Sequence, residues 1–469
     1  MLKKLFSHTA IYGLAPQISK LAYFFALPFI TGDLTDIDFG VAGIMTAYTT
    51  AISVFATLGL HLILVNSFYQ SPYQYKWRWR QIYGFLTLWN LVYAFVLGLM
   101  IYFVIPPEAE KDRWLILLLN ICPFIFFGQT TIIGNTLFRI KQLPMQIAIR
   151  AICFGLMNVV LMVLFIKYYK MGYMGWFWAT FISGMLSNIS YWYPLNVIYQ
   201  ITPIFNYKWK YIKRSLKVSI PTIPHYYSGY LLSNSDRMIM DFLKINASSI
   251  GKYNFAYTIA SPFVILSYAS GAALTPLVNE FYKKKEDIQA RNLVFITQLL
   301  FFILTFFSSI WTKEIFHYLV KNESLAQTYP LAIIVIMSQN YKPMYFGAFA
   351  KFFFLEKTNA LWKVTFIAGI TNVGLNLLLI PVLGYKIAAV TTFVSYLYMG
   401  YAGFFSKTGR EIKTVNYYPI LWLITTIILA FVAFYIAELT WPIKMIITLL
   451  GGAIGLPFLL RYIKKLNGR

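Results

Sequence analysis

Residues 172–183 read GYMGWFWATFIS, and residues 384–395 read GYKIAAVTTFVS. Glycine and tyrosine open both segments, Thr-Phe and a final serine return at the same places, and the second segment follows the first after nearly half of the 469-residue chain. Gly40 and Gly251 open two further apolar segments with almost the same offset. Such a repeat predicts two similar lobes, and lobes that move about a central site are typical of many secondary transporters.

The composition indicates a membrane protein. Hydrophobic residues make up 59% of the chain and charged residues 12%, about half the share found in soluble domains. The net charge of +24 could suggest a nucleic-acid partner. We reject that partner because the basic residues form short clusters between apolar runs, as in the cytoplasmic loops of membrane proteins. Cys122 and Cys153 lie in apolar runs and predict neither a disulfide framework nor a metal site.

The apolar runs predict an all-α polytopic membrane protein with about fourteen spans, since a spanning helix needs about 20 mostly apolar residues. The predicted spans are 9–30, 40–67, 82–105, 114–137, 147–166, 174–197, 217–235, 252–281, 291–312, 326–350, 361–383, 386–405, 417–437 and 441–462. We read the first as a retained helix rather than a signal peptide.

The spans divide into two pseudo-symmetric six-helix lobes with two added helices. The predicted parts are the N-terminal lobe (1–200), a basic cytoplasmic linker (201–216), the C-terminal lobe (217–406), and two further spans with a cytoplasmic tail (407–469).

The distribution of charge predicts that both termini are cytoplasmic. With that placement, 27 of the 40 lysines and arginines fall on the cytoplasmic side and 10 on the outer side. Residues 73–80 and 207–211 alternate aromatic with basic or polar side chains. We favour interfacial anchoring for these two segments, with capture of an anionic lipid substrate as the alternative.

No motif of chemical catalysis occurs in the chain. There is no GxxxxGK[ST], HExxH or GxSxG pattern, and the four histidines lie in different segments. We therefore expect neither an enzyme, nor an ATP-driven pump, nor a metal site.

The candidate functional residues are polar groups inside predicted spans. A charge at the bilayer centre costs about 2.5 to 3.5 kcal/mol, so Lys20 and Lys342 are candidates to bind a phosphate or pyrophosphate in a cavity. Pro343 follows Lys342 and frees a backbone carbonyl, which suits a cavity lining. The structural alternative is a snorkelling lysine, or one with a carboxylate or carbonyl partner, in a packed helix.

A second group of candidates lies at the weakest span, 217–235. We predict His225, Tyr226 and Asn234 to line the cavity and Asp236 and Arg237 to serve in gating or coupling. The alternative for all five is solvation at the end of a helix. A further candidate for coupling is His61, for which a packing role is the alternative.

Residues 219–237, SIPTIPHYYSGYLLSNSDR, resemble the start of the second lobe in Wzx-type polysaccharide-repeat flippases, members of the multidrug/oligosaccharidyl-lipid/polysaccharide (MOP) exporter superfamily. Residues 251–257 and 276–283 are similar to the continuation of that lobe, and residues 372–384 to a third segment. The resemblance covers the first twelve spans.

The resemblance implies that a polyprenyl-pyrophosphate-linked oligosaccharide, such as an O-antigen, capsule or lipopolysaccharide unit, moves to the outer leaflet of a bacterial cytoplasmic membrane. It implies alternating access, no catalysis, no cofactor beyond a coupling Na+ or H+, and polysaccharide polymerase machinery as a possible partner. Lys20 and Lys342 would be the cavity cations.

Three alternatives stay open. The first is a multidrug or peptidoglycan-precursor exporter of the same superfamily, and an acidic cavity would favour the drug exporter. A membrane polymerase or ligase would need a large external loop. A scaffold without transport activity would have a dry, sealed interface between its lobes.

Overall fold

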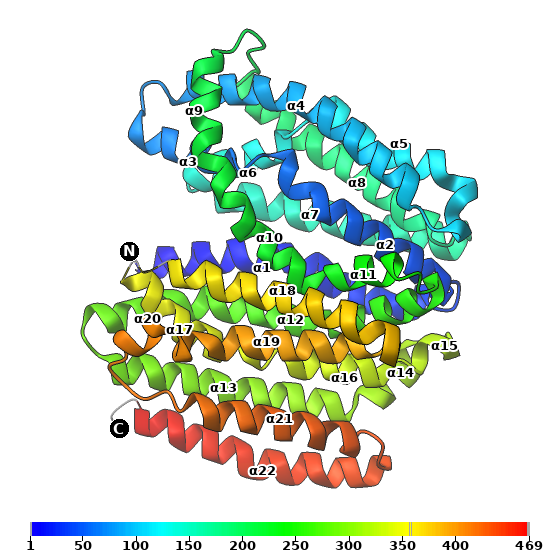
Figure 1. Cartoon of the computed structure of the whole chain (residues 1–469), viewed down its shortest axis with the longest axis vertical. Helices are drawn as coiled ribbons and strands as arrows, with labels where there is room; N and C mark the ends of the chain where they lie inside the picture. Colours follow the sequence, from blue (N-terminus) through cyan, green and yellow to red (C-terminus); the bar gives the residue numbers. More distant parts are fainter. Residues whose placement is uncertain (1, 356, 358, 467–469) are drawn as a thin grey trace. The chain divides into compact units, whose positions relative to one another are not determined.

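The computed structural model describes residues 2–355, 357 and 359–466, and it describes the side chains of these residues except at 2–14, 16, 225, 226, 272, 273, 359–361, 454, 456 and 458–466. Within this range the chain is helical and contains no strand (Figure 1). The first helices are α1 (Leu2–Ile30), α2 (Asp36–Ser53), α3 (His61–Gln70), α4 (Tyr75–Val104), α5 (Arg113–Phe127), α6 (Thr130–Ile140), α7 (Pro144–Val163), α8 (Met174–Tyr193), α9 (Trp209–Ser219) and α10 (Ile223–Ser233). The remaining helices are α11 (Ser235–Phe242), α12 (Ala247–Lys283), α13 (Asp287–Ile310), α14 (Thr312–Leu319), α15 (Glu323–Ala326), α16 (Tyr329–Ser338), α17 (Tyr341–Phe354), α18 (Asn359–Leu383), α19 (Ile387–Phe405), α20 (Lys407–Glu411), α21 (Pro419–Ile436) and α22 (Trp441–Leu466).

Many of these helices have the length and composition of membrane spans. Among the described residues, eight helices pass that test, and nine do if the bent pair Pro107–Phe127 and Thr130–Ile140 counts as one span. Two shorter apolar helices, Gln17–Ile30 and Trp441–Ala453, coincide with the first and last predicted spans. The all-α polytopic fold class is therefore confirmed.

Several predicted spans are interrupted rather than continuous. The span expected at 40–67 is divided between α2, a 3-10 turn and α3, with Leu58 and Gly59 at positive φ angles of 50° and 70° before α3. The span expected at 217–235 is divided between the end of α9, a 3-10 turn and α10, because Pro221 and Pro224 each remove a helix hydrogen bond. The span expected at 326–350 is divided between α16 and α17.

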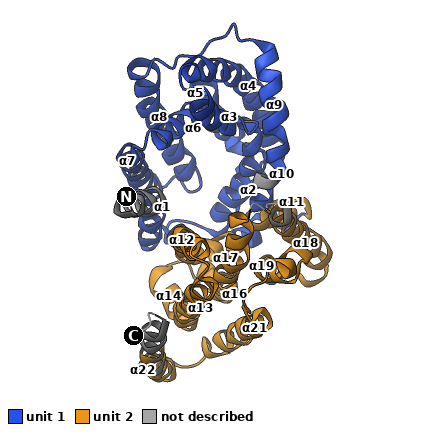
Figure 2. Ribbon diagram, turned by 90° about the vertical axis from the view of Figure 1, so that its left-hand side faces the viewer, with its two compact units in different colours: residues 1–230, 244–251 blue, residues 231–243, 252–469 orange. Residues whose placement is uncertain are grey.

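The chain forms two compact units (Figure 2). Unit 1 comprises residues 1–230 and 244–251, and unit 2 comprises residues 231–243 and 252–469. The lobe and linker limits expected from the sequence stay a prediction.

The sequence repeat has a structural counterpart in each unit. Gly172 and Gly384 both have positive φ angles, 53° and 77°, which glycine adopts without a steric cost. Each precedes a helix, α8 in unit 1 and α19 in unit 2. Helix α8 packs on α7, and α19 packs on α18. The repeat therefore marks one helical hairpin in each half of the sequence.

The second repeated pair, Gly40 and Gly251, forms a close helix contact within unit 1. A Cβ added to Gly40 would lie 2.0 Å from the carbonyl oxygen of Ala247, and one added to Gly251 would lie 1.7 Å from that of Asp36. The Ser248 hydroxyl donates to the Asp36 carboxylate at 2.6 Å. Only glycine at both positions allows α2 and the start of α12 to approach this closely.

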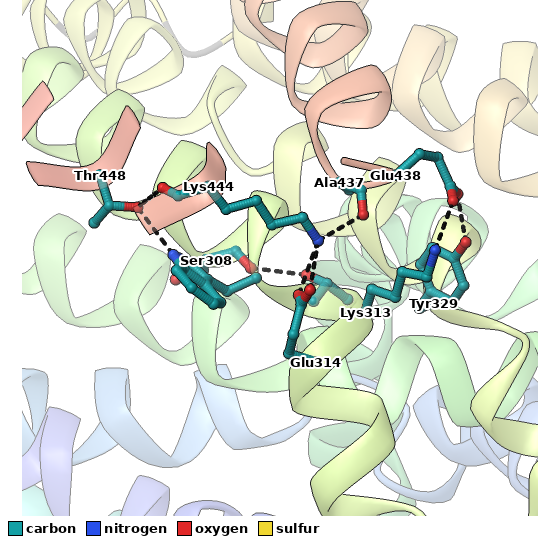
Figure 3. A network of polar contacts seen from close by, with 10 residues as sticks. Ser308, Lys313, Glu314, Tyr329, Ala437, Glu438, Lys444 and Thr448 are labelled. Carbon is teal, nitrogen blue, oxygen red and sulfur yellow. Dashed lines mark hydrogen bonds and ion pairs between the residues drawn. The ribbon is translucent and has the colours of Figure 1, made fainter. Parts of the chain in front are cut away.

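Within unit 2, a buried ion pair joins the added helix α22 to α14 (Figure 3). The side chain of Lys444 is fully buried. Its ammonium donates to both carboxylate oxygens of Glu314 on α14, at 2.7 and 2.9 Å, and to the carbonyl oxygen of Ala437 at 2.7 Å. Three acceptor atoms thus satisfy the one charge that α22 buries here.

A more exposed group of contacts lies beside this pair. Glu438 accepts hydrogen bonds from the hydroxyl of Tyr329 and, at 2.9 Å, from the ammonium of Lys313. The Tyr329 hydroxyl, followed by Lys313, holds the pKa of Glu438 below its usual value. The Trp311 indole donates to the Thr448 hydroxyl at 3.0 Å, which adds a contact between α22 and the rest of unit 2.

We expect Lys444→Met to destabilise unit 2 more than any other single change in this network. Removing one partner of a buried pair costs about 3 to 5 kcal/mol, and the lower end applies because the side chain of Glu314 is 25% exposed. The matched control Lys313→Met breaks a pair whose side chains are 43% and 48% exposed, and should cost less than about 1 kcal/mol. Thermal unfolding of both variants in detergent checks this order, and equal melting temperatures would contradict it.

Candidate functional site

The most buried charged group among the predicted site residues is the carboxylate of Asp236, at the start of α11. The residue is 0% exposed. Its carboxylate accepts four hydrogen bonds, from Tyr253 Oη at 2.5 Å, Asn372 Nδ2 at 2.6 Å, Asn376 Nδ2 at 2.7 Å and Thr392 Oγ1 at 3.0 Å. A buried carboxylate is stable only when donors replace water, and four donors do so here.

The donors come from three helices of unit 2. Asn372 and Asn376 are four residues apart on α18, so their amides lie on one face of that helix. Thr392 belongs to α19, which packs against α18. The neighbouring Thr391 hydroxyl donates to Asn376 Oδ1 at 2.5 Å and orients this amide toward Asp236. The carboxylate therefore holds α11, α12, α18 and α19 together.

Arg237 is also buried, with 5% of its surface exposed, but its polar contacts are separate from those of Asp236. Its Nε donates to Asn254 Oδ1 at 2.8 Å, and its Nη1 donates to the carbonyl oxygen of Ser233 at 2.9 Å. The guanidinium lies 4.7 Å from the ring centroid of Tyr257. Asp236 and Arg237 are thus packed inside unit 2, and the alternative of solvated residues at a helix end is wrong for both.

Lys342 on α17 lies in a box of aromatic rings. Its ammonium is 5.2 to 5.5 Å from the ring centroids of Tyr268, Tyr341, Tyr345 and Phe346, and it donates to the Tyr341 hydroxyl at 3.2 Å. Ring faces stabilise a cation without neutralising it. Tyr268 is 58% exposed, and Lys342 itself is half-buried. Within the described residues no carboxylate pairs with this lysine.

Buried side chains connect the aromatic box of Lys342 with the segment that carries Asp236. Tyr341 stacks on Tyr396 of α19, with ring centroids 4.6 Å apart and planes 5° apart. Both rings pack in one buried cluster with Leu232, which lies four residues before Asp236. A shift of α17 or α19 would therefore change the packing around both Lys342 and Asp236.

The other predicted residues lie elsewhere. Lys20 is on α1 in unit 1, with an exposed side chain. His61 begins α3 in unit 1 and is half-buried. Asn234 is at the break between α10 and α11, where its amide donates to the Ser233 hydroxyl at 3.0 Å. His225 and Tyr226 are outside the described side chains. The structure thus brings together Asp236, Arg237 and Asn234, but places Lys20 and His61 in a different unit from Lys342.

The sequence interpretation missed the ligands of Asp236 and the aromatic box. Asn372 and Asn376 had a usable signal, because two amides four residues apart in an apolar span must share a buried face. Tyr341 and Tyr345 are likewise four residues apart, which places both rings beside Lys342. Tyr253 gave no such signal, since only the fold brings it to Asp236.

The arrangement is suited to binding and not to bond-breaking chemistry. No group of three or more His, Cys, Asp or Glu side chains is placed to hold a metal ion within the residues that were searched. Around Asp236, however, carboxylate, amide and hydroxyl oxygens lie on neighbouring helices. If the two amides rotate, these oxygens form a ligand set of the kind that hard cations prefer.

Comparisons with known proteins agree with this geometry. The family model described as "Polysaccharide biosynthesis protein" matches residues 5–282. No curated protein sequence matches the chain. Among solved structures, the lipid II flippase MurJ in an inward closed conformation has a TM-score of 0.72 at 15% identity, covering 96% of this chain and 99% of its own.

Two further solved structures share the fold. An inward-facing multidrug resistance MATE family transporter of the MOP superfamily has a TM-score of 0.63 at 13% identity, covering 86% of this chain and 97% of its own. A MOP superfamily transporter from Pyrococcus furiosus has a TM-score of 0.55 at 14% identity, covering 87% of this chain and 95% of its own. The chain therefore has the fold of these polytopic membrane transporters over almost its entire length.

Proposed function

Because the chain belongs to the polysaccharide biosynthesis protein family, we propose that it flips a polyprenyl-pyrophosphate-linked oligosaccharide from the cytoplasmic to the outer leaflet of a bacterial cytoplasmic membrane. Proteins of this family are transporters and not enzymes, so we no longer consider the alternative of a polymerase or ligase. The likeness in fold to a lipid II flippase supports a lipid-linked saccharide as cargo.

The observation that carries this proposal is the cation of Lys342. Its ammonium lies among four rings, one of them the exposed Tyr268, and has no carboxylate partner among the described residues. A pyrophosphate is the part of the cargo that needs such a charge, while the polyprenyl tail stays in lipid. Lys20, exposed on α1, is the second proposed cation. Cationic groups disfavour the cationic substrates of many multidrug exporters, so we rank that alternative lower.

We further propose that transport is coupled to a Na+ or H+ gradient through Asp236. Its carboxylate is buried, and its four donors join four helices of unit 2. Binding of a cation or proton would remove hydrogen bonds to the carboxylate and so change the packing of α18 and α19 against α11. Alternating access of two lobes would then follow from a local change in one of them.

Replacement of Lys20 and Lys342 by glutamine tests the cargo assignment. Loss of one charge-assisted contact costs about 1.5 to 3 kcal/mol. We therefore expect each single variant to deliver lipid-linked saccharide to the outer leaflet about tenfold more slowly or worse, and the double variant to lose delivery.

The matched control for this experiment is Lys357→Gln, since Lys357 is exposed in the loop after α17. It should deliver the cargo at the normal rate. Normal delivery by the Lys20/Lys342 double variant, at normal protein levels, would reject both cations as cargo ligands.

A further inference from the structure

Unit 1 concentrates positive charge at the start of α4 and along α9. Residues 76–80 contain three cations and residues 208–217 contain five. All six carboxylates of unit 1 lie within residues 33–38 and 108–112. Helix α4 separates residue 76 from residue 108, and 30 residues at about 1.5 Å per residue span about 45 Å.

The carboxylates of unit 1 gather at the opposite end of α4. The backbone N–H of Tyr173 donates to Asp38 at 2.8 Å, and its hydroxyl donates to Asp112 at 2.6 Å. This joins the two acidic segments around one residue. Charges are screened over about 8 to 10 Å at physiological ionic strength, so no carboxylate of unit 1 compensates the basic end.

Helix α9 has one basic face and one packing face. Lys210, Lys213, Arg214 and Lys217 follow the spacing i, i+3, i+4 and i+7, which places four exposed cations on one side. The opposite side packs against α3 and α4 through three buried residues, Ile212, Ser215 and Ser219. The cations therefore face away from unit 1.

The chain before α9 is fixed to α4. The backbone N–H of Lys208 donates to Gln81 Oε1 at 2.6 Å, and that of Ile204 donates to the carbonyl oxygen of Arg80 at 3.0 Å. A Cβ on Gly84 would lie 1.9 Å from the carbonyl oxygen of Ile204, so the approach requires glycine. The two basic segments thus form one surface, which we call the basic platform: Lys76, Arg78, Lys210, Lys213, Arg214 and Lys217.

Exposed tryptophans border the basic platform. Trp77 is 39% exposed and Trp209 is 56% exposed. The Lys208 ammonium lies 5.4 Å from the ring centroid of Trp77, which leaves that ring beside the cations. Tryptophan with lysine and arginine is the combination that lies in the headgroup layer of a bilayer.

Some basic residues of unit 2 are paired with carboxylates. In the region of residues 280–287, Lys284 pairs with Glu280 at 2.8 Å and Lys351 pairs with Asp287 at 2.9 Å. Acidic side chains of the same unit thus partner cations there. Within unit 1, Lys170 pairs with Asp33 and Arg113 pairs with Glu110, both at the acidic end, but among the described residues no cation of the basic platform pairs with a carboxylate of unit 1.

From these exposed, unpaired cations and the tryptophans beside them we propose that the basic platform binds the headgroups of anionic phospholipids. The phosphate and further negative groups of such lipids supply the counter-charges that the basic end of unit 1 lacks, and Trp77 and Trp209 contact the interfacial region beside them. The basic platform shares no residue with the proposed cargo cations, so the proposal does not depend on the proposed function.

Thermal unfolding of the full-length protein in dodecyl maltoside micelles tests the proposal. We expect added dioleoyl phosphatidylglycerol to raise the melting temperature more than phosphatidylcholine does. The variant Lys210→Gln/Lys213→Gln/Arg214→Gln/Lys217→Gln should need at least about tenfold more phosphatidylglycerol for the same shift. The matched control Lys283→Gln/Lys284→Gln/Lys285→Gln, in unit 2, should keep the shift of the natural protein.

Two further measurements use the natural protein and do not depend on whether the variant folds. The phosphatidylglycerol shift should shrink between 50 and 500 mM salt, because exposed charges are screened. Inorganic phosphate at the same concentration should not reproduce it. An unchanged shift in the α9 variant, an equal loss in the unit 2 control, independence of salt, or an equal effect of inorganic phosphate would each overturn the proposal.

Discussion

Replacing Asp236 by asparagine is expected to abolish the dependence of transport on a Na+ or H+ gradient. The asparagine side chain has the same size but no charge, and its own amide N–H would face Tyr253, Asn372, Asn376 or Thr392 in place of an acceptor. The expected result is gradient-driven flipping reduced by a factor of about ten or more, since 1.4 kcal/mol corresponds to tenfold. Flipping measured with and without an imposed gradient checks this.

Asp236→Ala should have a larger effect on folding. It leaves four buried donors without their acceptor, and each unsatisfied group costs about 1 to 3 kcal/mol. The exposed carboxylate Glu323, in the same unit, provides the control. Glu323→Gln should keep both stability and gradient dependence. An Asp236→Asn protein present at normal levels that still responds fully to the gradient would remove Asp236 from the coupling mechanism.

The second large effect is expected at the glycine contact of unit 1. In Gly251→Ala, the new Cβ would lie 1.7 Å from the carbonyl oxygen of Asp36. This is a backbone atom within α2, so it cannot move aside as a flexible side chain could. Overpacking costs about 1 to 3 kcal/mol, and a backbone clash belongs at the upper end of that range. Melting temperature and yield of folded protein in detergent measure the loss.

Gly184→Ala is the matched control for this prediction. Gly184 lies within α8 of the same unit, and an added Cβ would meet no atom within 4 Å. Alanine favours a helix by about 0.5 to 1 kcal/mol over glycine, so this variant should be as stable as the natural protein or more so. If Gly251→Ala proved equally stable, the close contact between α2 and α12 would be wrong.

The sequence predicted the helical fold because its strongest signals are local. Long apolar runs identify spans. Gly172 and Gly384 mark turns because each adopts a positive φ angle that glycine allows without a steric cost. The breaks were harder to predict. Leu58 has a positive φ that its side chain does not favour, so tertiary contacts and not local preference bend the chain there.

The candidate site could be predicted only in part. The polar cluster at the end of the weakest span predicts Asp236 as a candidate, but its burial depends on Tyr253, Asn372 and Thr392, which lie up to 156 residues away. The box around Lys342 needs Tyr268 from another helix. Contacts of this range are set by packing. Local patterns in one sequence do not reveal which buried polar groups come into contact.

The most direct test of the account is reconstitution of the purified protein into lipid vesicles that contain a polyprenyl-pyrophosphate-linked oligosaccharide in one leaflet. We predict that the saccharide becomes accessible on the opposite side only when the protein is present, and faster when a Na+ or H+ gradient is imposed. Folded protein that leaves the saccharide as inaccessible as in protein-free vesicles would contradict the account.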